Sequence, residues 1–120
     1  MHTTNKDDAP EFRTKDGLVS RILHAGGDVD TNLAVTWVEV EPGGSQVIHS
    51  HNHEQVYVVI SGEGRVYVDG DNRAVSAGEL IHIPSNADHG IENTSEEVLV
   101  YISAATPAFS LEKIQKFYEE

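Results

Sequence analysis

The chain has 120 residues, a formal net charge of −12 and no cysteine. This length supports one hydrophobic core and one domain, and the lack of cysteine excludes disulfide bonds and thiolate metal sites. The acidic charge opposes binding to nucleic acid or to anionic membranes, because both present negative charge that calls for Lys and Arg. No apolar run approaches the ~20 residues of a membrane span, and the polar N-terminal stretch lacks a signal-peptide core. We therefore expect a soluble cytoplasmic protein with no nucleic-acid or membrane partner.

The first elements in chain order are a tail and two strands. Residues 1–10 are polar and predict a flexible tail, so residues 11–120 are expected to form the single domain. Gly17–His24 predicts a strand that pairs at a sheet edge or with a partner subunit. Asn32–Glu41 is dense in β-branched and aromatic residues and predicts a second strand. On one face of that strand, Trp37 either contacts a second subunit or packs on the N-terminal strand.

Clusters of Gly, Pro, Asn and Ser separate a series of further short strands, and Asp69-Gly70-Asp71-Asn72 predicts a hairpin turn. These spacings indicate an all-β sandwich or barrel rather than alternating strands and helices. After Pro107 the apolar residues recur at helical spacing behind Ser110, a suitable N-cap, which predicts a helix at about 110–119. The further strands are expected at Gln46–His51, Gln55–Ile60, Arg65–Asp69, Arg73–Ser76, Leu80–Ile83, His89–Asn93 and Val98–Ser103, and the apolar helix face at Leu111, Ile114, Phe117 and Tyr118.

Three of the seven histidines alternate along the chain, at His49, His51 and His53. Residues two apart on a strand point to the same face, roughly 6–7 Å apart along the chain, so two imidazoles can tilt toward one ion. Gln55 on the next strand adds a neutral oxygen donor, and His89 must be brought in by the fold. An HxH pair by itself does not distinguish a metal site from a chance cluster of surface histidines.

Two longer patterns connect these residues. The stretch 43–62 resembles the first motif of the cupin superfamily, G-x5-H-x-H-x3,4-E-x6-G, and the stretch 78–93 resembles the second, G-x5-P-x-G-x2-H-x3-N. Every spacing fits, but Gln55 stands where the first motif has Glu, and Asn86 where the second has Gly. The matching positions are Gly43, His49, His51, Gln55 and Gly62 in the first motif, and Gly78, Pro84, Asn86, His89 and Asn93 in the second.

The resemblance implies a double-stranded β-helix, the cupin jelly-roll barrel, to which the pattern adds the short C-terminal helix. It also implies one divalent transition metal ion held by His49, His51, Gln55 and His89, with Fe, Mn, Co, Ni, Cu and Zn all open. Because Gln55 replaces a carboxylate, the site should hold metal less tightly and attract an anionic ligand more strongly. Asn86 is a mild departure, since Asn tolerates the left-handed backbone conformation.

Several neighbouring side chains keep alternative roles. Glu54 could be the ligand if the turn before it were one residue longer, although the six residues before Gly62 favour Gln55. His53 could be a fifth ligand, but a place in the turn at the barrel mouth is favoured. The hydroxyl of Tyr57, on the same face as Gln55, could orient a substrate or act as a catalytic acid, or serve only a structural hydrogen bond. His82 could line the pocket or the outer surface.

The function that the resemblance implies is that of a metal-dependent enzyme, of dioxygenase, decarboxylase, isomerase or cyclase type, acting on a small oxygen-bearing anionic substrate. The alternatives are a non-catalytic metal or small-molecule binding or storage protein, and a structural role with a vestigial site. A homodimer is expected, because small cupins usually associate and both faces of Gln55–Ile60 are apolar.

Overall fold

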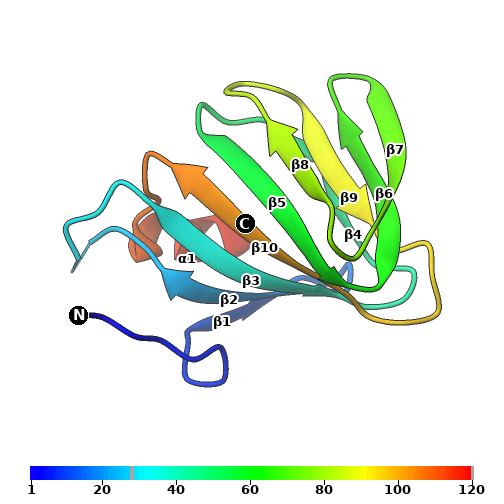
Figure 1. Cartoon of the computed structure of the whole chain (residues 1–120). Helices are drawn as coiled ribbons and strands as arrows, with labels where there is room; N and C mark the ends of the chain where they lie inside the picture. The colour runs from blue at the N-terminus through cyan, green and yellow to red at the C-terminus, as the bar shows by residue number, and fades with distance from the viewer. Residues whose placement is uncertain (28, 120) are drawn as a thin grey trace.

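The computed structural model describes residues 1–27 and 29–119, the side chains of residues 117–119 excepted. Within this part the chain forms ten strands and a short C-terminal helix (Figure 1). The described part of the chain contains no helix with the length and apolar character that a membrane span needs. The elements are β1 (Glu11–Arg13), β2 (Leu18–His24), β3 (Ala34–Val40), β4 (Ser45–His49), β5 (Glu54–Ser61), β6 (Glu63–Val68), β7 (Asp71–Ser76), β8 (Leu80–Ile83), β9 (His89–Glu92), β10 (Leu99–Thr106) and α1 (Leu111–Glu119).

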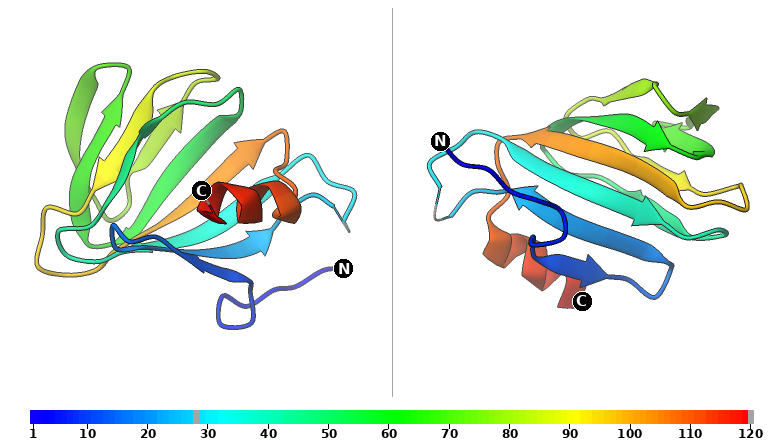
Figure 2. Two further views of the ribbon diagram at one scale, coloured as in Figure 1. Left: turned by 180° about the vertical axis from the view of Figure 1, so that it is seen from behind. Right: turned by 60° about the horizontal axis from the view of Figure 1, so that its bottom comes forward.

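The strands form two antiparallel sheets that face each other, which is the jelly-roll arrangement expected from the sequence. One sheet has the order β1-β2-β3-β10-β5-β8 and the other β4-β9-β6-β7. β10 is central to the first sheet, because it pairs with β3 on one side and with β5 on the other. Seen from two further sides, α1 lies beside β2 and β1 (Figure 2).

The core follows from side-chain alternation along these central strands. On β3 and β5 every second residue is turned inward, so Val38, Val40, Tyr57 and Val59 are buried together with Tyr101 of β10. The opposite face of β5 is less well covered than the sequence predicted. Its Val56 and Val58 are only half-buried, and Ile60 is 44% exposed, so the expectation that β5 is covered on both faces is wrong.

The strands β4, β2 and β1 differ from expectation. β4 ends at His49, so His51 lies in the following loop rather than on the same strand, and the β4–β9 register shifts between Gln46 and His49. The strand expected at a sheet edge, β2, is internal, because the unpredicted β1 pairs along its other side. A three-residue strand carries too little periodicity to be recognised from sequence.

The turns follow backbone preferences. The β6–β7 hairpin turns at Asp69 and Gly70 alone, with φ of 48° and 82°, as two-residue hairpins require. Asp71 and Asn72, expected in the turn, belong to β7. Asn86 has a φ of 67°, the left-handed conformation that its place in the second motif requires.

The chain ends are held by local contacts. Ser110 Oγ accepts a hydrogen bond from the Lys113 backbone N–H at 3.2 Å, the N-cap predicted from sequence. Phe117 and Tyr118, expected on the apolar face of α1, have side chains outside the described residues. At the other end, Trp37 is half-buried on β3 with the Lys6 ammonium 5.6 Å from its ring centroid.

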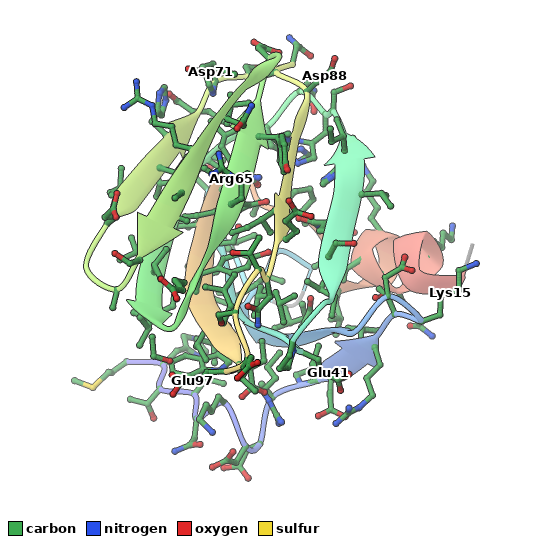
Figure 3. All side chains as sticks on the ribbon, turned by 90° about the vertical axis from the view of Figure 1, so that its right-hand side faces the viewer. Lys15, Glu41, Arg65, Asp71, Asp88 and Glu97 are labelled. Carbon is green, nitrogen blue, oxygen red and sulfur yellow. The ribbon has the colours of Figure 1, made fainter. Side chains whose placement is uncertain are left out.

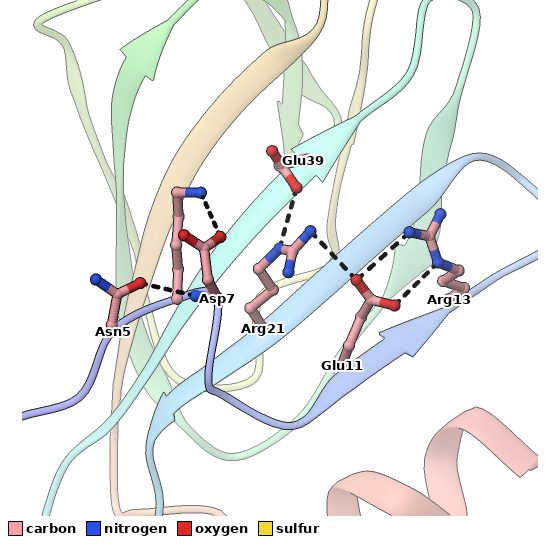
Figure 4. A network of polar contacts seen from close by, with 7 residues as sticks. Asn5, Asp7, Glu11, Arg13, Arg21 and Glu39 are labelled. Carbon is pink, nitrogen blue, oxygen red and sulfur yellow. Dashed lines mark hydrogen bonds and ion pairs between the residues drawn. The ribbon is translucent and has the colours of Figure 1, made fainter.

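The outer surface of β2 and β3 carries a charged network rather than an exposed aromatic face (Figure 4). Arg21 lies between two carboxylates, 3.2 Å from Glu11 and 3.2 Å from Glu39, and Arg13 contacts Glu11 at 3.1 Å. The network connects the N-terminal strand β1 to the central sheet, next to the side on which Lys6 covers Trp37. Solvent-exposed ion pairs of this kind contribute at most about 1 kcal/mol each.

The last glycine of the first motif generates a prediction about stability. Gly62 has a φ of +83°, and a Cβ there would lie 2.6 Å from the Val98 carbonyl oxygen, whereas Gly70 has a φ of +82° and no such atom within 4 Å. We expect Gly62→Ala to lower the free energy of unfolding by about 2–4 kcal/mol, from left-handed strain plus overlap. Gly70→Ala should cost only the strain, about 1–2 kcal/mol. Chemical denaturation measures both, and equal losses would contradict the close approach at Gly62.

Candidate metal centre

Two histidines of one segment, His49 and His51, meet the distant His89 inside the barrel. His49 ends β4, His51 lies in the loop to β5, and His89 begins β9. His49 and His89 are directly opposed in the β4–β9 pairing, which accounts for their approach. One ring nitrogen from each of the three lies within 4.8 Å of the others, and the ring centroids are 4.3–5.5 Å apart.

Backbone carbonyls orient two of these rings. Nδ1 of His89 lies 2.9 Å from the Ala87 carbonyl oxygen, and Nδ1 of His49 lies 2.9 Å from that of Val47. A carbonyl only accepts, so each Nδ1 carries the proton and each Nε2 keeps its lone pair. This second contact is typical of histidines that bind metals. The buried Nδ1 of His51 has no hydrogen-bond partner among the described residues, which a metal ion nearby would explain more readily than an apolar core.

Two of the imidazoles, those of His51 and His89, are held in the neutral form that a metal requires. The pKa of His51 is lowered to about 4, mainly by burial and then by the neighbouring imidazoles of His89, His49 and His53. Burial also lowers the pKa of His89, against the opposing effect of its hydrogen bond to Ala87. Both rings are therefore uncharged at neutral pH. A proton competes with a metal ion for them less well than it would for a free imidazole.

Gln55 completes the cluster from β5. Its side chain is buried, and its Nε2 lies 2.9 Å from Nε2 of His89 and 3.3 Å from the Tyr57 hydroxyl. Tyr57 in turn donates to Oε1 of Gln46 at 3.1 Å. Rotation of the Gln55 amide exchanges its nitrogen for its oxygen, so the same position can present an oxygen to an ion beside His89.

The structure separates the alternative ligands from the cluster. Glu54 points to the outer surface, where its Oε2 lies 2.8 Å from Nε2 of His82, and both side chains are exposed. His82 therefore lies outside the pocket. His53 stacks on Phe109, with centroids 3.8 Å apart and an interplanar angle of 28°, and is absent from the group of nitrogens that converge. Burial, followed by the positive charge of Lys113, lowers the pKa of His53.

A cavity of about 380 Å³ lies beside the histidines, within the size range of small-molecule sites. His49, His51, Gln55 and Tyr57 line it, and Tyr57 is buried as its parity with Gln55 predicted. Sequence reasoning missed the contribution of the C-terminal segment, where Phe109, Lys113 and Ile114 also line the cavity. The only available signal was the amphipathic pattern after Pro107, and it does not say which surface the helix covers.

The last residue of the second motif has a structural role. Asn93 is buried, and its Nδ2 donates to the carbonyl oxygens of Val40 at 2.9 Å and Glu97 at 2.6 Å. Its Oδ1 accepts from the Ser95 backbone N–H at 2.9 Å. Asn93 thus holds the β9–β10 turn against the end of β3, and it takes no part in the histidine cluster.

Comparison with known proteins agrees with this geometry. A family model described as a cupin domain matches residues 36–105, more than half of the chain. The chain belongs to the cupin family. This cupin is 28% identical over 111 residues to an uncharacterized protein of Methanocaldococcus jannaschii, covering 91% of this chain and 89% of that protein.

Solved structures show the same fold. An RmlC-like cupin from Shewanella frigidimarina superposes with a TM-score of 0.78 at 25% identity, covering 90% of this chain and 92% of that chain. The polyketide cyclase RemF from Streptomyces resistomycificus superposes with a TM-score of 0.77 at 23% identity, covering 88% and 79%. At that identity the likeness to RemF concerns the fold alone.

The cluster generates a prediction about metal binding that compares His51 with the outward-facing His82. We expect His51→Ala to weaken Co²⁺ binding by about 10- to 100-fold or more, since it removes a converging nitrogen. His82→Ala is the control and should leave the affinity unchanged, because His82 faces outward against Glu54. Isothermal titration calorimetry on tag-free protein measures both. Equal affinities for the two variants would show that the ion binds elsewhere.

Proposed function

We propose that this cupin is a metal-dependent enzyme that acts on a small, oxygen-bearing anionic substrate. One divalent transition metal ion would be held by His49, His51, Gln55 and His89. The observation that carries the proposal is the convergence of three imidazoles beside a cavity large enough for a small molecule. Nitrogen donors of this kind suit first-row ions from manganese to zinc. When bound, such an ion supplies Lewis-acid or oxygen chemistry at its open positions.

The charge of the donor set supports an anionic substrate. All four proposed ligands are neutral, so the protein does not offset the charge of a divalent ion, as a carboxylate ligand would. Gln55 is kept at this position by its contacts with His89 and Tyr57. The neutral amide is thus a built feature of the site, held by a chain of hydrogen bonds that continues to Gln46.

Tyr57 is the residue that we propose for a role in the reaction. Its hydroxyl faces the cavity, accepts from Gln55 and donates to Gln46. In this arrangement the hydroxyl first positions Gln55. A substrate oxygen that replaced Gln46 as the acceptor would receive the Tyr57 proton in a hydrogen bond, which places the hydroxyl to orient a substrate or to act as an acid.

A binding or storage protein without turnover is the second candidate, and one observation favours it. Among the described residues that line the cavity there is no Asp or Glu. The described lining therefore offers histidines, Tyr57 and Lys113 but no carboxylate base. Reactions that need a separate carboxylate base are disfavoured by this composition.

A turnover screen distinguishes the two candidates. Protein loaded with Fe²⁺ or Mn²⁺ would be incubated with a panel of carboxylic acids while oxygen uptake and product formation are followed. We expect at least one acid to be converted, and conversion to be lost in metal-free protein and in His89→Ala. Saturable binding with no conversion across the panel would support the binding protein instead.

A substitution at Gln55 is expected to change the affinity for metal and the affinity for an anion in opposite directions. Gln55→Glu adds a negative charge beside the ion, so we expect tighter Co²⁺ binding, by about tenfold or more, and weaker binding of a carboxylate to the loaded protein. The control is Gln46→Glu, which places a charge at the far end of the hydrogen-bond chain and should change metal affinity less. Calorimetry measures both affinities. An unchanged metal affinity in Gln55→Glu would contradict its place as a ligand.

The homodimer and the cytoplasmic location stay predictions from the sequence. The surface of β5 and β8 supports association, because Ile60 is 44% and Leu80 60% exposed on the same outer face. A subunit interface there would cover apolar side chains that the single chain leaves in water. A single-subunit mass in sedimentation at micromolar concentration would contradict the homodimer.

A further inference from the structure

The cavity beside the histidines has a composition unlike that of the rest of the chain. The protein carries 20 Asp and Glu residues against 8 Lys and Arg residues, yet Lys113 is the one formally charged side chain among the described residues that line the cavity. Acidic side chains such as Glu41, Asp71, Asp88 and Glu97 lie on the outside of the barrel (Figure 3). The described lining of this cavity thus contains a cation and no acidic side chain, although the protein as a whole is strongly acidic.

Lys113 enters this cavity from the C-terminal helix. The start of α1 is fixed by backbone hydrogen bonds between Gly26 and the 109–111 segment, at 2.7 Å from Gly26 N–H to the Phe109 carbonyl. Phe109 stacks on His53, and His53 contacts His51 edge to face at 5.0 Å. Lys113 lines the same cavity as His49, His51 and His53. The cation and the histidine cluster therefore border one cavity.

Apolar side chains form much of the cavity lining. Leu18 and Ile22 of β2, Val38 of β3 and Tyr101 of β10 line the cavity from the inner face of the large sheet, and Ile114 adds a wall from α1. A polyhydroxylated ligand would lose its hydrogen bonds to water against these side chains, which costs free energy for each unpaired hydroxyl. An apolar ring or short chain would be stabilised there in proportion to the area it buries.

A short row of hydroxyl groups crosses this apolar wall. Thr36 is the register partner of Ser103, and Ser103 is the register partner of Tyr57, so the three follow one another across β3, β10 and β5. All three line the cavity, and the row ends beside Gln55. Neighbouring side chains in such a row lie about 5 Å apart. The row offers hydrogen bonds to a single oxygen substituent on an otherwise apolar ligand.

We propose that the cavity selects amphipathic organic acids, with a carboxylate between the histidine cluster and Lys113 and an apolar ring or chain against Leu18, Val38 and Tyr101. This inference rests on the proposed function and names its substrate class. Lys113 acts as the residue that determines specificity for the acid over uncharged analogues. Compact dianions leave the apolar walls unfilled, and sugar acids place hydroxyl groups against them.

The test uses 3-phenylpropanoate as the probe and Co²⁺-loaded full-length protein in calorimetry. The comparison ligands are its uncharged amide, oxalate as a compact dianion, and gluconate as a sugar acid. We expect 3-phenylpropanoate to bind at least about tenfold more tightly than each of them, since the ring buries apolar area that they lack or the charge is missing. Oxalate or gluconate binding as tightly as the probe would overturn the proposed substrate class.

Two lysines of the same helix provide a matched pair. Lys113→Ala should weaken 3-phenylpropanoate binding by about fivefold and leave amide binding unchanged, because it removes one partly solvated ion pair. Lys116→Ala is the control, since Lys116, exposed like Lys113, does not line the cavity and pairs with Glu112 at 3.6 Å. Thermal denaturation of both variants confirms that they are folded. Equal effects of the two substitutions would overturn the role of Lys113.

Failure of the proposed function has a different signature. If Co²⁺ does not bind, or no acid is converted, the metal-dependent enzyme is wrong, and the substrate class is then tested on metal-free protein. The apolar walls and Lys113 do not need the ion, so the preference for 3-phenylpropanoate over its amide should persist with lower affinity. Loss of that preference in metal-free Lys113→Ala, but not in Lys116→Ala, would support the inference. If neither metal-free nor Co²⁺-loaded protein prefers 3-phenylpropanoate over its amide, the inferred substrate class is wrong.

Discussion

The site depends on one strand pairing, that of β4 with β9. This pairing sets His49 directly opposite His89, although forty residues separate them in the chain. Opposed side chains on antiparallel strands lie about 5 Å apart, which is close enough for two imidazoles to face a common ion. The irregular register between Gln46 and His49 lets β4 end there, so that His51 enters from the loop. A slip of one residue would turn His89 to the other face of the sheet and take the cluster apart.

The charges near the histidines differ from those of the outer surface. The family position that usually carries a carboxylate holds the neutral Gln55, and a hydrogen-bond chain through Tyr57 to Gln46 keeps that amide in place. The cavity beyond it excludes acidic side chains among the described residues, while the outer surface is rich in them. In the proposed function, a metal ion, Lys113 and the apolar walls would act on different parts of one ligand. The local reversal of charge would then favour acids in a protein that is acidic as a whole.

Comparison of the expected and observed elements shows where local patterns suffice. Alternation placed Tyr57 on the same face as Gln55, and both are buried, while the Asp69-Gly70 turn and Asn86 followed from backbone preferences that depend on one or two residues. The errors arose where a partner strand decides the outcome. β4 was expected to continue to His51, but its pairing with β9 ends at His49. The short β1 pairs with the edge of β2, and no pattern within Glu11–Arg13 predicts this pairing.

The sequence alone determined the family, the two motif stretches and the identity of the histidines, because motif spacing reflects strand length and turn geometry within continuous segments. It also determined that the chain is acidic and that Gln55 replaces a carboxylate. Only the tertiary structure decided that His53 stacks on Phe109, that Glu54 turns outward to His82, and that α1 brings Lys113 to the cavity. Each of these depends on contacts between segments far apart in the chain. Their free energies come from packing and charge across space, which residue spacing does not encode.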